Sequence, residues 1–173
     1  MHFKLWLESQ YKYAVVLFEM PADLSSKIIS FSQKFIPKSC LSEDGREDEP
    51  HVTVLYGLND KDFEKVKEKI KDFKQFNIRL GSISKFDNKE KYDVLKIDVI
   101  GDSIRKLNKK IKEIPHYSNY NEYKPHCTLA YVKKDSCNSL LKNNHFENTV
   151  IKIKSVNFID TSKNKKIIKL QES

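Results

Sequence analysis

The sequence predicts an α+β fold with duplicated β–α–β units that form two pseudo-symmetric antiparallel-sheet lobes around a central cleft. Two observations indicate the duplication. Apolar strands and amphipathic helices follow the same order in both halves. Two heptapeptides, Pro50–Tyr56 (PHVTVLY) and Pro125–Tyr131 (PHCTLAY), also share their Pro, His, Thr and Tyr. We expect a single domain over residues 1–173, with repeat 1 at about 12–86 and repeat 2 at about 90–160.

The first repeat reads as β–α–loop–β–α–β. Its strands are short apolar runs, and its helices carry apolar side chains at helical spacing, the first of them after Pro21. The expected elements are a strand at 13–20, a helix at 24–35, a polar loop at 42–50, a strand at 51–56, a helix at 63–73 and a strand at 76–80.

The second repeat follows the same order. Leu95, Ile97 and Val99 alternate along its first strand and therefore share one face. The expected elements are a strand at 92–100, a helix at 104–114, a polar loop at 115–125, a strand at 126–132, a short helix around 136–142, a strand around 150–158 and an edge strand at 166–170.

Composition excludes several classes of protein. The chain is 39% hydrophobic, enough for a packed core, and it lacks the run of about 18 apolar residues that a membrane span needs. Three cysteines without a CxxC pair indicate neither a disulfide framework nor a zinc finger, so we expect a reduced, cytoplasmic protein. Four glycines leave no Gly-rich phosphate loop. The net charge of +8 suits an anionic partner without indicating one.

The repeated His-x-Thr motif is the candidate for chemistry. Side chains two positions apart share one face of a strand, so His51 lies beside Thr53 and His126 beside Thr128. If the two lobes face each other, two imidazoles and two hydroxyls surround one small volume. One neutral and one protonated histidine can serve as general base and general acid near pH 7. The threonine hydroxyls can donate to phosphate oxygens.

The same residues make a metal site an unfavourable interpretation. A catalytic zinc usually has three protein ligands, and the partner two residues after each histidine is threonine, a poor zinc ligand. Cys127 neighbours His126 and points to the other face of the strand. We therefore expect neither a metal nor any other cofactor.

His51-Val-Thr-Val54 and His126-Cys-Thr-Leu129 resemble the two signatures of the two-histidine (2H) phosphoesterase superfamily. The resemblance covers roughly residues 12–160, and the stretch 47–58 is similar to phage and viral members. It implies a LigT-like fold and a metal-independent phosphodiesterase whose catalytic residues are His51, Thr53, His126 and Thr128.

Among members of that superfamily, the expected substrate is a small nucleotide with a ribose-linked phosphodiester. A 2′-5′ oligoadenylate or a cyclic oligonucleotide immune signal such as cGAMP would fit, which would make the protein an immune-evasion factor of the host cytoplasm if it is viral. Two alternatives stay open: processing of RNA 2′,3′-cyclic phosphate ends, and a non-catalytic nucleotide or RNA sponge. The sequence does not assign base and acid to particular histidines.

Substrate-binding candidates lie around the two motifs: Tyr13, Tyr56, Tyr123, Lys124 and Tyr131. A spacing of five turns Tyr56 and Tyr131 away from the histidines in a regular strand, unless a bulge near Gly57 re-aims Tyr56.

The remaining tyrosines leave alternatives open. The tyrosines of the loop before the second motif could stack on a base or anchor the loop, and Trp6 and Tyr11 could join Tyr13 in a base pocket. We expect a monomer with no membrane partner, and RNA remains a possible partner.

Overall fold

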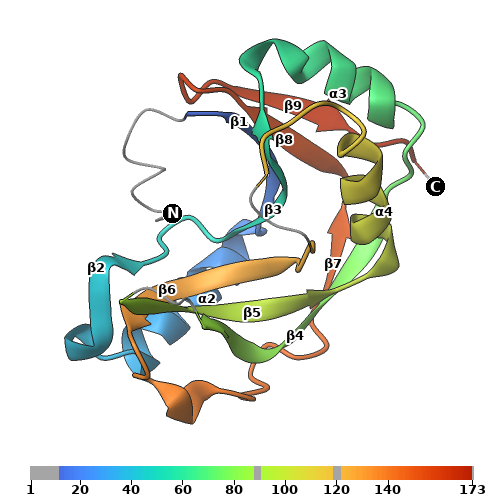
Figure 1. Ribbon diagram of the computed structural model, residues 1–173. Coiled ribbons are helices and arrows are strands. Elements are labelled where there is room, and N and C mark those ends of the chain that lie inside the picture. The colour runs from blue at the N-terminus through green and yellow to red at the C-terminus, as the bar shows by residue number, and fades with distance from the viewer. Residues whose placement is uncertain (1–11, 88–90, 119–121, 173) are drawn as a thin grey trace.

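The computed structural model describes residues 12–87, 91–118 and 122–172. Within them the chain forms one strongly curved nine-stranded sheet in the order β7-β4-β5-β6-β3-β1-β8-β9, with β2 paired to β6 (Figure 1). All pairings between these named strands are antiparallel. The predicted α+β fold with antiparallel sheets is therefore confirmed.

The first part of the chain supplies the strands and helices that surround the first motif. In chain order they are β1 (Ala14–Glu19), α2 (Ala22–Phe35), β2 (Leu41–Arg46), β3 (His51–Leu58), α3 (Phe63–Ile70) and β4 (Phe76–Asp87).

The second part supplies those that surround the second motif. They are β5 (Tyr92–Ile100), α4 (Asp102–Ile111), β6 (His126–Lys133), β7 (Val150–Ile153), β8 (Ser155–Ile159) and β9 (Lys165–Lys169).

Alternation along the central strands gives the sheet one apolar face and one polar face. Val52, Cys127 and Ile97 are fully buried in the main core, where the apolar stripes of α2, α3 and α4 also pack. His51 and Thr53 alternate with Val52, so they lie on the opposite, concave face of the sheet. The helices thus pack on the core face of the sheet, and the alternation sets the motif residues on the other face.

The two repeats exchange their last strands. β4 ends the first repeat but pairs with β5 of the second, whereas β8 lies in the second repeat but pairs with β1 of the first. The two halves of the sheet meet at β3 and β6, where Val52 pairs with Cys127. Both motif strands therefore lie at the centre of the molecule, where the halves join (Figure 1).

Three local expectations are wrong. The polar segment 42–50 is not all loop, because β2 pairs with β6 from Leu41 to Arg46. The helix expected around 136–142 is only a single 3₁₀ turn, Asn138–Leu140. The strand expected around 150–158 is interrupted at Lys154 and forms β7 and β8, which join opposite halves of the sheet.

Candidate active site

The two motifs meet across the junction of the sheet. Val52 pairs with Cys127 in antiparallel register, so the flanking positions set His51 beside Thr128 and Thr53 beside His126. Facing residues in such a pair have Cβ atoms about 4.5–5.5 Å apart. The two imidazoles and two hydroxyls therefore form a compact group with approximate twofold symmetry on the concave face.

Each imidazole is held in the same way. Nδ1 of His51 lies 2.7 Å from the backbone oxygen of Glu49, and Nδ1 of His126 lies 2.7 Å from that of Lys124. A carbonyl oxygen can only accept a hydrogen bond, so each Nδ1 carries the hydrogen and donates it. The proton-accepting or proton-donating position that remains on each ring is Nε2.

The surroundings of His126 keep it neutral. Burial lowers the pKa of His126 from 6.5 to about 4, and the positive charges of Lys96 and His51 act in the same direction. The carbonyl of Lys124 and the carboxylate of Asp98 oppose this effect. The ring also meets Phe86 edge-on, with 4.8 Å between ring centroids. At pH 7 His126 therefore presents an unprotonated Nε2, as a general base must.

A bulge follows the threonine in both motif strands. Leu17 pairs with Thr53 and Val16 with Leu55, so β3 carries one extra residue after Thr53. In β6, Thr128 pairs with Lys96 and Ala130 pairs with the preceding residue, Leu95, so β6 also carries one extra residue after the threonine. The bulges shift the alternation of each strand by one position.

The shift overturns the expectation that Tyr56 and Tyr131 point away from the histidines. Val15 pairs with Tyr56 and Leu17 with Thr53, and two residues that are two apart on one strand share a face. Tyr131 and Thr128 pair with Val94 and Lys96 in the same way. Both tyrosines therefore lie on the concave face. In β3 the bulge that re-aims Tyr56 lies next to Thr53, and a second irregularity at Gly57 follows it, because Ala14 pairs with Leu58 and Val15 with Tyr56.

Three tyrosines cluster at the repeat-1 end of this face. Tyr13 stacks on Tyr117 with 5.1 Å between ring centroids and meets Tyr56 edge-on at 5.8 Å. The backbone N–H of Tyr117 donates to the oxygen of Gly57 at 2.8 Å. Gly57 has a φ of +100°, and a Cβ there would lie 1.8 Å from the oxygen of Tyr117, so the close approach requires glycine. Trp6, Tyr11 and Tyr120 lie outside the described residues.

The side chains of two other candidates contact none of the four motif side chains in the interactions that the structure describes: Tyr123 bonds to a backbone oxygen, and Lys124 lies at the surface. The hydroxyl of Tyr123 donates to the backbone oxygen of Thr53 at 2.9 Å, and its ring packs against the main core. Through these contacts Tyr123 anchors the loop before β6 to β3. Burial also raises the pKa of the Tyr123 hydroxyl. The side chain of Lys124 is exposed and lies 3.4 Å from Glu122. Substrate binding by Tyr123 and Lys124 stays a prediction.

A polar cluster that the sequence did not predict lies beside the second motif. Lys96 and Asp98 of β5 pair with Thr128 and His126, and Nζ of Lys96 lies 2.5 Å from Oδ1 of Asp98 and 2.6 Å from Oγ of Ser84. The alternation of residues 92–100 already set Lys96 and Asp98 on the face opposite the core. What it could not show was that this strand lies next to the one that carries His126.

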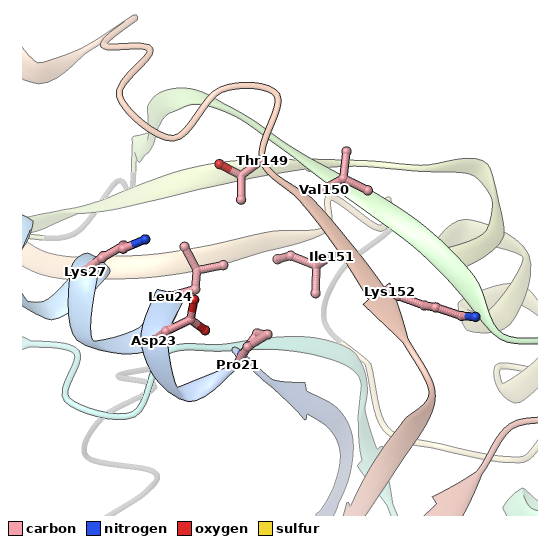
Figure 2. Close-up of a pocket in the computed structure, with 8 residues that line it drawn as sticks. All are labelled: Pro21, Asp23, Leu24, Lys27, Thr149, Val150, Ile151 and Lys152. Carbon is pink, nitrogen blue, oxygen red and sulfur yellow. The ribbon is translucent and has the colours of Figure 1, made fainter.

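A shallow groove elsewhere on the molecule is a different feature. It has a volume of about 240 Å³ and lies between the start of α2 and β7. Figure 2 shows its lining, in which Asp23 and Lys27 are the polar groups of the helix and Lys152 lies on the strand. The groove contains no motif residue, so it is not the candidate active site. Its full lining is Pro21, Asp23, Leu24, Lys27, Thr149, Val150, Ile151 and Lys152.

Two further properties of the described residues concern metal binding and membrane spans. Among the described residues, no group of three or more His, Cys, Asp or Glu side chains could hold a metal ion. Catalysis without a metal nevertheless stays a prediction, because this absence does not test it. No helix within the described ranges is long and apolar enough to cross a membrane.

Known structures share this fold. TT0787 of Thermus thermophilus matches with a TM-score of 0.66 and 12% identity over 92% of this chain and 95% of that one. E. coli LigT complexed with 3′-AMP gives the same four values. E. coli LigT complexed with NADP+ matches with a TM-score of 0.62 and 15% identity over 92% and 95%.

Sequence comparison gives the family. No curated protein matches the chain significantly. The model of the family described as anti-CBASS protein Acb1, however, matches residues 25–166, which is most of the chain and includes both His-x-Thr motifs. The chain therefore belongs to the anti-CBASS protein Acb1 family, and with it to the two-histidine phosphoesterase superfamily.

Proposed function

We propose that this protein is a metal-independent phosphodiesterase that cleaves a ribose-linked phosphodiester in a small nucleotide, specifically a cyclic oligonucleotide immune signal. The observation that carries the proposal is the juxtaposition of His51 with Thr128 and of Thr53 with His126, with each Nδ1 held by a backbone carbonyl. Such an arrangement supplies two proton-transfer groups and two hydroxyl donors to one phosphate.

The chemical step divides the work between the histidines. Nε2 of His126 takes the proton of the nucleophile, which is water or a neighbouring ribose hydroxyl. As the new P–O bond forms, the P–O bond to the leaving ribose oxygen breaks, and the imidazolium of His51 protonates that oxygen. The lowered pKa of His126 supports its role as the base. Each proton transfer contributes about 10²–10⁴-fold to the rate.

The threonines stabilise the phosphorane-like transition state. Thr53 and Thr128 each lie beside the histidine of the other motif, so the two hydroxyls approach the phosphate from opposite sides. Their hydrogens donate to the non-bridging oxygens, on which negative charge increases during the displacement. Because the strands fix these side chains in advance, little reorganisation is needed at the moment of reaction.

Aromatic side chains provide surfaces for the bases. Tyr56 lies on the concave face, where it meets Tyr13 edge-on. Stacking of a base on an aromatic ring contributes about 1–3 kcal/mol. Tyr131 lies on the same face near Tyr92 but is only 2% exposed, so its ring offers no face to a base. The group of Tyr13, Tyr56 and Tyr117 is therefore the surface that we assign to a base. Tyr123 and Lys124 remain candidates at the margin of this surface.

The family description supports the proposed substrate class. The matching family is named for anti-CBASS activity, and the resemblance of both motifs to viral enzymes that degrade cyclic-nucleotide signals agrees with it. LigT structures contain 3′-AMP, ATP and NADP+, which supports a nucleotide-sized ligand for this fold. A monomer in the cytoplasm, with RNA as a possible further partner, stays a prediction.

A cleavage panel in excess EDTA tests the proposal. It contains 2′-5′ oligoadenylate, 2′3′- and 3′3′-cGAMP, a cyclic triadenylate and an RNA 2′,3′-cyclic phosphate, with products identified by mass. We expect the protein to cleave at least one cyclic oligonucleotide, and the His51→Ala and His126→Ala variants to lose cleavage while they still bind it.

His116→Ala is the matched control. Nδ1 of His116 lies 2.8 Å from the oxygen of Ile114, so it shares the local geometry of the motif histidines but belongs to neither motif. Its activity should therefore equal that of the parent. Cleavage of only the RNA 2′,3′-cyclic phosphate would favour end processing. Tight binding without turnover of any member would refute the enzyme proposal and leave a nucleotide sponge.

A further inference from the structure

The two halves of the concave face match at β3 and β6, which carry the histidines. They differ at the neighbouring strands, β1 in one half and β5 in the other. Thr53 pairs with Leu17 of β1, whereas Thr128 pairs with Lys96 of β5. Leu17 belongs to a small apolar cluster with Val15 and Ile159, against which Tyr56 packs. Both sides carry a carboxylate beside the histidine, Glu19 beside His51 and Asp98 beside His126. Beside the threonine, however, the repeat-1 side has the apolar Leu17 where the repeat-2 side has the ammonium group of Lys96.

Lys96 has a hydrogen left for a ligand. Its ammonium group donates to Oδ1 of Asp98 at 2.5 Å and to Oγ of Ser84 at 2.6 Å. It also lies over the ring of Phe86, 4.4 Å from the centroid. A lysine ammonium has three N–H donors, and these contacts use two of them in hydrogen bonds. The cluster thus fixes the position of the charge without exhausting its donors.

The burial of Lys96 matches that of the catalytic pair. Lys96 is 6% exposed, and both His51 and Thr128 are 7% exposed, so all three lie at the same depth in the floor of the concave face. Burial of a lysine is costly, and an ion pair often does not recover that cost. Repeat 1 avoids the cost with Leu17 at the equivalent position. A role in stability alone therefore does not explain why Lys96 is there.

We propose that Lys96 is a further substrate-binding residue, which donates to a non-bridging oxygen of the phosphodiester on the Thr128 side and so fixes the direction in which the substrate lies. This inference rests on the proposed function and deepens it. In a cleft with two equivalent halves, a dinucleotide could bind either way round. With an ammonium group beside Thr128 and a leucine beside Thr53, only one of the two orientations brings the phosphate charge to the Lys96 ammonium group.

The first test compares phosphate binding by Lys96→Met and Lys96→Arg, with inorganic phosphate as the probe and the histidine NMR signals as the readout. A charge-assisted hydrogen bond is removed in Lys96→Met, so we expect phosphate affinity and kcat/KM to fall about 10- to 100-fold. Lys96→Arg retains the charge and should keep most of both. Unchanged phosphate affinity in Lys96→Met would overturn the proposal.

Lys85→Met is the matched control. Lys85 belongs to the same β4–β5 hairpin but pairs with Asp93, with Nζ 3.1 Å from Oδ2, away from the motif residues. Its loss should leave phosphate affinity unchanged. If Lys96→Met fails to fold, Lys96→Gln decides, because it keeps a polar side chain for Asp98 and Ser84 but removes the charge. Lys96→Gln should bind phosphate about 10-fold more weakly than the parent, and unchanged binding would refute the proposal.

A second readout separates a direct role from a structural one. The charged groups around His126 are Lys96 and Asp98 of β5 and His51 of β3. The positive charge of Lys96 lowers the pKa of His126, and the carboxylate of Asp98 raises it. Lys96→Met removes the positive charge and leaves the carboxylate, so the pKa of His126 should rise. Lys85→Met should leave the pKa of His126 unchanged. A parent that cleaves no nucleotide would refute the proposed function, and the phosphate titration would still decide the role of Lys96.

Discussion

The environment of His126 should make the protein lose stability in mild acid. The unfolded histidine has a pKa near 6.5, and burial lowers the pKa of the folded one to about 4. Between these values the unfolded state binds a proton that the folded state does not. The stabilising contribution is therefore fully present above pH 6.5 and is lost as the pH falls toward 4.

The two values set the size of this effect. A difference of about 2.5 pH units at ~1.36 kcal/mol each gives an upper limit of about 3 kcal/mol below pH 4. Between pH 7 and pH 4.5 the same two values give a loss of about 2 kcal/mol in the free energy of unfolding. Other groups also titrate in this range, so the loss must be measured against a variant that lacks only this imidazole.

Urea unfolding of the parent and of His126→Gln at pH 7 and pH 4.5 provides that comparison. We expect the parent to lose about 2 kcal/mol more than His126→Gln over this interval. His116→Gln, which removes a histidine with the same Nδ1 contact outside the motifs, should behave like the parent. Equal losses in the parent and in His126→Gln would refute the account of His126 as a neutral base.

Three further substitutions test separate parts of the site. Thr128→Val should lower kcat about 100-fold with little change in KM, since it removes a hydroxyl that acts on the transition state; a change confined to KM would contradict this. Gly57→Ala should raise KM, because its Cβ would lie 1.8 Å from the oxygen of Tyr117 and displace the stacked tyrosine; unchanged kinetics would mean that this loop does not contact substrate. Tyr123→Phe should lower the free energy of unfolding by about 1 kcal/mol in urea, through loss of its bond to Thr53; an unchanged value would argue against an anchoring role.

Much of the site could be predicted because two strands of equal pattern carry it. Side chains on a strand alternate with a period of two, so the sequence alone sets each histidine beside its threonine on one face. The repetition of the motif then indicates a common site. The register in which Val52 pairs with Cys127 depends on how two distant strands approach each other, and no local pattern encodes it.

The predictions that were wrong failed because they depend on how distant strands pair. The bulges after Thr53 and Thr128 reverse the faces on which Tyr56 and Tyr131 lie, and no glycine or proline marks either bulge in the sequence. The segment with β2 reads as a loop because it is polar, yet it becomes a strand when β6 offers a free edge. Lys96 was missed because its importance comes from its neighbours on β4 and β6.

In the proposed reaction His126 removes a proton and His51 delivers one to the leaving oxygen. A substrate with sulfur in place of that bridging ribose oxygen separates the two roles, because a thiolate leaves without the help of an acid. With this substrate in excess EDTA, we expect His51→Ala to regain most of the parent rate and His126→Ala to remain inactive. Equal rescue of both variants, or of neither, would contradict the division of roles between the two histidines.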